Sequence, residues 1–126
     1  MGIRAFRDLK VWQKSHQITL AIYKITATFP REELFGLTSQ MRRASASVPA
    51  NIAEGCGRNS ESDFARFLTI AMGSASELEY HLLLSRDLSL LGEDEYVQLS
   101  TDLEEVKRML TGFIQKLKAS DKTTES

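Results

Sequence analysis

A stripe of polar side chains along residues 40–58 is the most unusual polar feature of this sequence. Its members recur at steps of three or four residues, so they share one side of a helix. Arginine guanidinium groups on such a stripe suit phosphate oxygens, and an asparagine amide suits a polar base edge. The alternative is an ordinary solvent-exposed face, which spacing alone favours. The stripe consists of Gln40, Arg43, Ser47, Asn51, Glu54 and Arg58.

The other reactive residues give little support for catalysis or metal binding. The two histidines, His16 and His81, fall on different predicted helices with no Cys or carboxylate at ligand spacing beside either. The single cysteine, Cys56, stands in a Gly-Cys-Gly sequence that we interpret as a helix stop, with the thiol as a bystander. No nucleophile elbow, phosphate-binding loop or dinucleotide-binding glycine motif occurs. We therefore expect no catalytic residues, no metal and no cofactor.

Length and composition restrict the class of protein. The 126 residues suit one domain with one hydrophobic core, and 42% hydrophobic with 26% charged residues is typical of a globular chain. With one cysteine and no signal-peptide pattern, the chain is expected to be cytoplasmic. No apolar run approaches the roughly 18 residues of a membrane-spanning helix, so we expect no contact with a membrane.

The net charge of −1 argues against a surface that grips nucleic acid everywhere, but the charge is uneven. Residues 1–60 carry nine Lys or Arg and four Asp or Glu, whereas residues 61–126 carry seven and thirteen. Mutual neutralisation of the two halves within a compact fold is the simpler interpretation. The alternative is one basic face.

Apolar side chains at helical spacing predict the elements that must position these residues. Short connections between them favour an all-α, antiparallel up-and-down four-helix bundle over residues 1–118, followed by a flexible tail at 119–126. The predicted helices cover residues of about 8–29, 38–56, 60–91 and 93–118.

Several residues mark the helix ends. Pro30 stops the first helix, and Thr38 is a good N-cap for the second. Pro49 is expected to kink the second helix without dividing it. Ser60, followed three residues later by Asp63, resembles a capping box at the start of the third helix. The third helix is expected to end at Gly92.

The first predicted helix carries a second apolar stripe opposite its core face. A helix at the edge of a monomeric bundle needs only one apolar face, so this stripe predicts self-association. The alternative is that another helix or the N-terminal arm covers the stripe within one chain. The stripe consists of Leu9, Trp12, His16, Leu20, Tyr23 and Ala27.

Three stretches of the chain resemble a known family. They are FRDLKVWQKSH at 6–16, FPREELFGLTSQMRRASASVPANIAEGCGR at 29–58 and SESDFARFLTIAMGSASELEYHL at 60–82. They resemble the proteins encoded within intervening sequences of bacterial large-subunit ribosomal RNA genes, the 23S rRNA-intervening sequence protein family. The residues that carry the pattern are Trp12, Gln13, Gly36, Gln40, Arg42, Arg43, Pro49, Asn51, Glu54, Gly55 and Arg58.

The resemblance implies a four-helix bundle that assembles as a homopentamer, has no known enzymatic activity and is linked to ribosomal RNA. Similar proteins serve as accessory factors of diversity-generating retroelements, in which a basic pentamer binds nucleic acid and a reverse transcriptase. This chain differs from those relatives in being slightly acidic overall.

Two functional hypotheses follow. In the first, a homo-oligomer binds RNA or another nucleic acid through basic and polar residues that assembly gathers on one surface. In the second, the protein is a scaffold that binds a protein partner such as a reverse transcriptase, without contacting nucleic acid. The predicted nucleic-acid-binding residues are Lys10, Lys14, Lys24, Arg42, Arg43, Asn51, Arg58 and Arg66. The predicted oligomer interface consists of Leu9, Trp12, His16, Leu20 and Tyr23.

Overall fold

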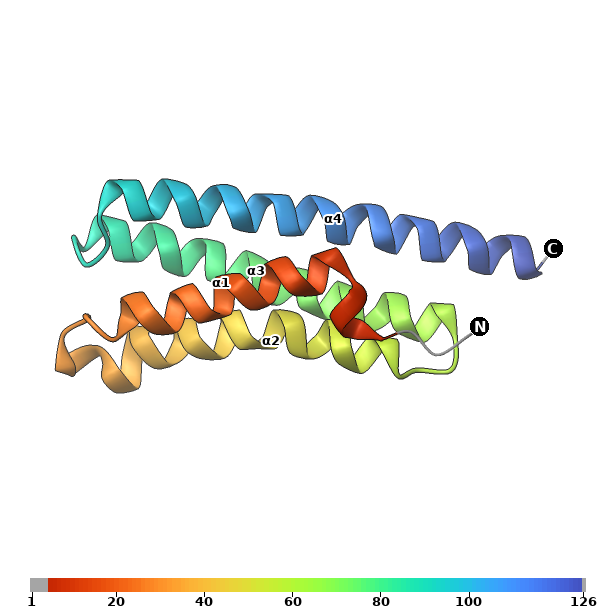
Figure 1. Ribbon diagram of the computed structural model, residues 1–126, viewed down its shortest axis with the longest axis horizontal. Coiled ribbons are helices and arrows are strands. Elements are labelled where there is room, and N and C mark those ends of the chain that lie inside the picture. The colour runs from red at the N-terminus through yellow and green to blue at the C-terminus, as the bar shows by residue number, and fades with distance from the viewer. Residues whose placement is uncertain (1–4, 126) are drawn as a thin grey trace.

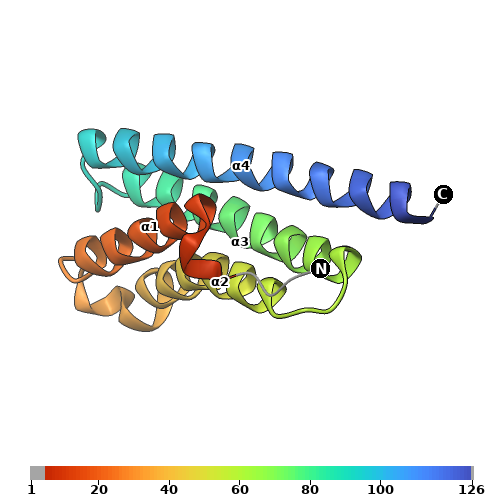
Figure 2. The ribbon, with the colours of Figure 1, turned by 45° about the vertical axis from the view of Figure 1, so that its right-hand side comes forward.

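Four helices make up the computed structural model, which describes residues 5–125 (Figure 1). Each helix contacts the next one in the chain, α4 also contacts α1, and short turns join neighbours that run in opposite directions (Figures 1 and 2). The described residues contain no strand, so the predicted all-α fold with four helices is confirmed. The helices are α1 (Lys10–Thr26), α2 (Ser39–Cys56), α3 (Glu61–Asp87) and α4 (Glu93–Glu125).

The core is formed where the apolar stripes of the four helices meet. These stripes are the ones that sequence periodicity picks out, and burying them supplies the main stabilising contribution. The largest side chains that are completely removed from solvent include Ile22, Met41, Ile52, Phe64, Leu68, Leu78, Leu82, Leu103 and Leu110.

Helix α1 is shorter than predicted at both ends. At its start, a 3₁₀ turn over Phe6–Asp8 is separated from α1 by Leu9, whose backbone is extended. At its end, α1 stops at Thr26 instead of residue 29. The amides of Thr28 and Phe29 bond back three residues instead of four, which tightens the chain into a turn ahead of Pro30.

The connection from α1 to α2 is helical instead of the predicted open loop. A 3₁₀ turn over Arg31–Glu33 leads into a wider turn over Leu34–Thr38, which joins α2 directly. The expectation that Thr38 caps α2 is wrong, because Thr38 has helical backbone angles and its side chain makes no capping bond. The Glu33 carboxylate takes a capping role instead, accepting a 3.3 Å hydrogen bond from the Leu37 amide.

Helix α2 continues through Pro49 to Cys56, as the sequence predicts for an undivided helix. Gly55 lies inside the helix and is buried, and Gly57 has a φ of −87°, so neither glycine ends the helix through a left-handed backbone. A Cβ atom on Gly55 would lie only 2.7 Å from Cδ1 of Phe64 on α3. The glycine therefore allows α2 and α3 to approach closely near their turn.

Helix α3 begins as predicted and ends early. The Ser60 hydroxyl accepts a 3.0 Å hydrogen bond from the Asp63 amide. The helix ends at Asp87 instead of residue 91, because Ser89 adopts a φ of 62° and its neighbour Leu90 bonds back to the Ser85 carbonyl at 2.9 Å. This is a Schellman ending, in which serine occupies the position where glycine is usual.

The prediction of a flexible tail after residue 118 is wrong, because α4 is longer than predicted. The helix continues past residue 118 to Glu125, so the predicted tail is helical over 119–125, and residue 126 lies outside the described residues. The reason is that no glycine or proline follows Gly112 to stop the helix. Figure 1 shows the last turns of α4 projecting beyond the other helices.

Candidate functional site

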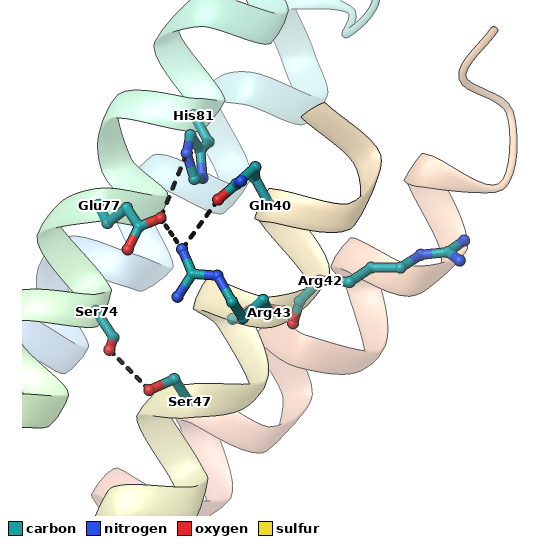
Figure 3. Close-up of polar contacts among 8 residues, drawn as sticks. Gln40, Arg42, Arg43, Ser47, Ser74, Glu77 and His81 are labelled. Carbon is teal, nitrogen blue, oxygen red and sulfur yellow. Dashed lines mark hydrogen bonds and ion pairs between the residues drawn. The ribbon is translucent and has the colours of Figure 1, made fainter. Parts of the chain in front are cut away.

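The polar stripe of α2 lies along the seam with α3, where its side chains form a partly exposed network (Figure 3). The Arg43 guanidinium forms an ion pair with the Glu77 carboxylate and donates a 3.1 Å hydrogen bond to the Gln40 side-chain oxygen. The same carboxylate lies 3.7 Å from Nε2 of His81. Because Glu77 and His81 belong to α3, this cluster connects the two helices along their seam.

The network continues toward the α2–α3 turn. The hydroxyls of Ser47 and Ser74 share a 2.8 Å hydrogen bond across the seam (Figure 3). The Asn51 amide donates to the Ser47 carbonyl at 2.8 Å and to the Ser47 hydroxyl at 3.0 Å. The amide hydrogens of Asn51 thus have partners within α2.

A second cluster surrounds Phe67 at the start of α3. Arg58 lies 3.3 Å from the Glu54 carboxylate, and Asp63 lies 3.6 Å from Arg58 and 2.9 Å from Arg66. Both guanidinium groups stand over the Phe67 ring, each with its central carbon 4.5 Å from the ring centre. The structure therefore brings Arg58 and Arg66 together, but acidic side chains offset their charge.

Arg42 points to the opposite side of α2 from Arg43 (Figure 3). Its Nε donates a 2.9 Å hydrogen bond to the Thr26 hydroxyl, and its guanidinium lies over the Tyr23 ring at 4.9 Å. A longer bond of 3.5 Å reaches the Tyr23 carbonyl near the end of α1, where a positive charge is favourable. Arg42 forms no ion pair with an acidic side chain of the described residues.

The lysines of α1 divide into one that is paired and two that are not. Lys14 lies 3.0 Å from Glu105 and 3.6 Å from Asp102 on α4, and the hydrogen bond to Glu105 is the main reason that the pKa of Lys14 is raised. Lys10 and Lys24 are exposed and form no ion pair within residues 5–125. Lys14 therefore joins Arg43 and Arg58 in neutralising acidic residues of the second half of the chain, whereas Lys10 and Lys24 do not.

Residues along the exposed side of α1 form what we call the α1 outer face, defined as Lys10, Gln13, Gln17 and Lys24. Their steps of three, four and seven residues place them on one side of the helix. No Asp or Glu occurs anywhere in α1. Gln17 is not among the residues predicted from the sequence, and the α1 outer face was not predicted as a surface. The absence of acidic residues between Asp8 and Glu32 could have indicated this face.

The second apolar stripe of α1 divides into a covered half and an exposed half. Phe6 of the N-terminal turn packs on Trp12 with ring centres 4.9 Å apart, and Trp12 stacks on His16 at the same distance. The N-terminal arm thus covers part of the stripe, which was the alternative interpretation. Leu20 and Tyr23 remain 51% and 45% exposed.

His81 lies on α3 beside the Arg43–Glu77 pair. Burial lowers the pKa of His81 below its ordinary value, and the nearby Arg43 adds to this effect while Glu77 opposes it. Its Nδ1 is buried without a hydrogen-bond partner in the described part of the chain. The imidazole is therefore neutral at pH 7.

The described residues were also compared with the requirements of a metal site and of a membrane-spanning helix. Within residues 5–125, no group of three or more His, Cys, Asp or Glu side chains is arranged to hold a metal ion. In the same range, no helix is both long enough and apolar enough to cross a membrane.

Comparisons with known proteins give one family and a similar solved structure. The model of the family described as 23S rRNA-intervening sequence protein matches residues 7–112. A crystal structure from Bacteroides thetaiotaomicron, described as a protein with unknown function from the S23 ribosomal protein family, is 29% identical with a TM-score of 0.75. The match covers 82% of this chain and 97% of that one. No curated protein matches the chain.

Proposed function

Because the chain belongs to the 23S rRNA-intervening sequence protein family, we propose that it is a non-enzymatic binding module that associates with RNA as a homo-oligomer. The family description connects these proteins with ribosomal RNA genes, and the solved relative is described as having unknown function. The proposal therefore depends on which surface of this chain suits RNA.

The α1 outer face is the surface that supports the proposal. Lys10 and Lys24 form no ion pair within residues 5–125, and no acidic residue lies on α1 to repel phosphate. The exposed Gln17 adds a side-chain amide between the two lysines, whereas the Gln13 amide already donates a 2.7 Å hydrogen bond to the Arg7 carbonyl. Each free lysine that meets a phosphate releases counterions, which is the main source of sequence-independent affinity for RNA.

The motif residues on α2 support the bundle instead. Arg43 and Arg58 pair with Glu77 and Glu54, and the amide of Asn51 is bonded within its own helix. The carboxylate beside each guanidinium offsets its positive charge, which weakens its attraction for a phosphate. Of the residues predicted to bind nucleic acid, we therefore assign Lys10 and Lys24 to RNA, with Arg42 at the C-terminal end of α1, and the others to structure.

Assembly is needed because two lysines give little affinity alone. Repetition of the α1 outer face around a homo-oligomer, which we propose to be the pentamer implied by the family resemblance, multiplies weak phosphate contacts into avidity. The exposed Leu20 and Tyr23 lie on the neighbouring side of α1. Subunits can thus contact each other through these residues while leaving the lysines accessible.

The experiment measures binding of a short fluorescein-labelled single-stranded RNA by anisotropy, at about 50 and 200 mM salt. The paired substitution Lys10→Ala with Lys24→Ala should reduce the slope of log affinity against log salt by roughly one for each lost contact. The control pair, Lys116→Ala with Lys118→Ala, removes the same charge from exposed positions of α4 and should leave the slope unchanged. An equal effect of both pairs would contradict a specific role for α1.

A second candidate function is a scaffold that binds a protein partner. It is supported by the pairing of Arg43 with Glu77 and of Arg58 with Glu54, because arginines paired within the chain stabilise the bundle. If the wild-type protein assembles but binds no RNA at low salt, the scaffold function replaces the RNA-binding one.

A further inference from the structure

Arg42 differs from the other two motif arginines of this region in having no acidic partner. Its guanidinium lies over the Tyr23 ring of α1, with the central carbon 4.9 Å from the ring centre. Figure 3 shows the side chain extending away from the Arg43–Glu77 pair. Within residues 5–125 Arg42 forms no ion pair, so its positive charge is not offset. It is therefore the motif arginine best suited to a ligand from outside the bundle.

The Arg42 guanidinium is held along one edge and free along another. Nε donates a 2.9 Å hydrogen bond to the Thr26 hydroxyl, and Nη2 donates a longer bond of 3.5 Å to the Tyr23 carbonyl. A guanidinium has five N–H donors, and those of Nη1 have no partner within the described residues. Because Arg42 is half-buried and lines a surface hollow, the group stays accessible while its orientation is fixed. A planar group fixed in advance loses little entropy when it binds.

The hollow beside Arg42 has a volume of about 190 Å³ and lies where α1 ends. Arg31 and Arg42 both line it, and no Asp or Glu of the described residues does. Glu33 follows Arg31 closely in the chain, but its carboxylate accepts the hydrogen bond from the Leu37 amide. Pockets for drug-sized ligands measure roughly 300–1,000 Å³. This hollow is smaller, so it suits a single planar ring instead of a whole nucleotide.

The walls of the hollow favour a neutral ring over a bare anion. Thr26 and Ala27, at the C-terminal end of α1, line the hollow, and the last carbonyls of a helix carry partial negative charge. These carbonyls would repel a phosphate or a carboxylate placed inside. A nucleobase is uncharged and planar, an arginine guanidinium stacks on its face, and its edge atoms form hydrogen bonds. The chemistry of the hollow therefore suits a base whose phosphates stay outside it.

Cations for those phosphates stand beside the hollow. Lys24 and Arg31 are exposed, and neither forms an ion pair within residues 5–125. Lys24 is the last member of the α1 outer face, and it follows Tyr23, whose ring Arg42 covers. An RNA strand that runs along the α1 outer face from Lys10 to Lys24 therefore arrives at Arg42.

We propose that Arg42 stacks on an unpaired base of the bound RNA, while Lys24 and Arg31 contact the phosphates on either side of that base. This inference rests on the proposed RNA binding and names the form of RNA that is bound. It is a single strand, because base pairing and stacking cover the bases of a duplex. The α1 outer face supplies affinity for any phosphate backbone, and Arg42 adds a preference for a strand with accessible bases.

The test compares two fluorescein-labelled single strands with equal numbers of phosphates, one of ordinary RNA and one of abasic nucleotides. Stacking of one base is worth about fivefold or more, so the wild-type protein should bind the ordinary strand at least about fivefold more tightly. Arg42→Lys keeps the positive charge and removes the planar group, so this ratio should fall close to one. Affinity for the abasic strand and the salt slope should stay at wild-type values. Circular dichroism verifies the fold of each variant.

Two control variants show whether the effect belongs to Arg42. Arg108→Lys makes the same substitution at an exposed position of α4 and should keep the wild-type ratio. Phe35 offers a rival stacking surface, since it lies in the turn that precedes α2 and is 93% exposed. It does not line the hollow, so Phe35→Ala should also keep the ratio.

Three results would contradict the inference. If Arg42→Lys keeps the wild-type ratio, or if Phe35→Ala abolishes it, the base does not stack on Arg42. Equal binding of both strands by the wild type would also overturn the inference, while leaving the proposed RNA binding through phosphates in place. If the wild type binds neither strand at low salt, the proposed RNA-binding function fails and the inference fails with it.

Discussion

Replacement of Gly55 by alanine should lower the free energy of unfolding. The contacts that the added methyl group would make give the approximate size of this loss. The added methyl group would lie 2.7 Å from Cδ1 of Phe64 and 3.1 Å from Cβ of Phe67. Phe64 is fully buried and Cβ of Phe67 is fixed to the backbone of α3, so neither can move aside without shifting the helix. Overpacking of this kind costs about 1–3 kcal/mol. The better helix propensity of alanine offsets about 0.5–1 kcal/mol of that cost.

The net loss for Gly55→Ala is therefore up to about 2.5 kcal/mol, with a central value of about 1 kcal/mol, or a decrease in melting temperature of up to about 10 °C for a chain of this length. Thermal unfolding followed by circular dichroism, at one fixed protein concentration, measures it. Gly73 and Gly112 provide the matched controls, since a Cβ on either meets no atom within 4 Å. Alanine at these two positions should raise stability by up to about 1 kcal/mol. A Gly55→Ala protein as stable as the controls would refute the close approach of α2 and α3.

The remaining predictions concern the seam, pH and assembly. A double-mutant cycle between Arg43→Ala and Glu77→Ala should give a coupling energy of about 0.2–1 kcal/mol that falls with added salt, because both side chains are partly exposed. A coupling energy of zero would contradict a structural role for this ion pair. The lowered pKa of His81 means that the unfolded chain takes up a proton first, so stability should fall as pH drops below the ordinary histidine value of about 6.5. His81→Gln should flatten this part of a pH series of urea unfolding curves, and an unchanged curve would contradict a buried neutral imidazole. Leu20→Lys, in the exposed half of the second apolar stripe of α1, should weaken assembly in light scattering, and wild-type mass would exclude Leu20 from the contact.

The architecture was accessible from the sequence because apolar spacing encodes which face of each helix is buried. The helix ends were less accessible, since they depend on local hydrogen bonds that several residue types can supply. Ser89 adopts the backbone angle usually taken by glycine, and Glu33 supplies the capping bond expected from Thr38. At the C-terminus, the absence of a breaker let α4 continue where polarity suggested a tail.

The candidate site shows a different limit of sequence reasoning. The spacing correctly places Arg43 and Asn51 on one side of α2, with Arg58 in the connection that follows it, but spacing cannot reveal that this side faces acidic and polar residues of α3. Pairing across helices depends on the relative rotation of two elements distant in sequence. The exposure of Phe35 depends in the same way on an unusual turn. The family resemblance identified Arg43, Asn51 and Arg58 as characteristic residues, but it did not distinguish a binding role from a structural one.

The claim that RNA binds along the α1 outer face is tested most directly by lysine acetylation footprinting. The protein is treated with a limited dose of acetylating reagent with and without the single-stranded RNA, and the modification of each lysine is read by mass spectrometry. We expect RNA to protect Lys10 and Lys24, while Lys107 and Lys116 on α4 react equally in both samples. Unchanged reactivity at Lys10 and Lys24 under conditions where RNA is bound would contradict the claim.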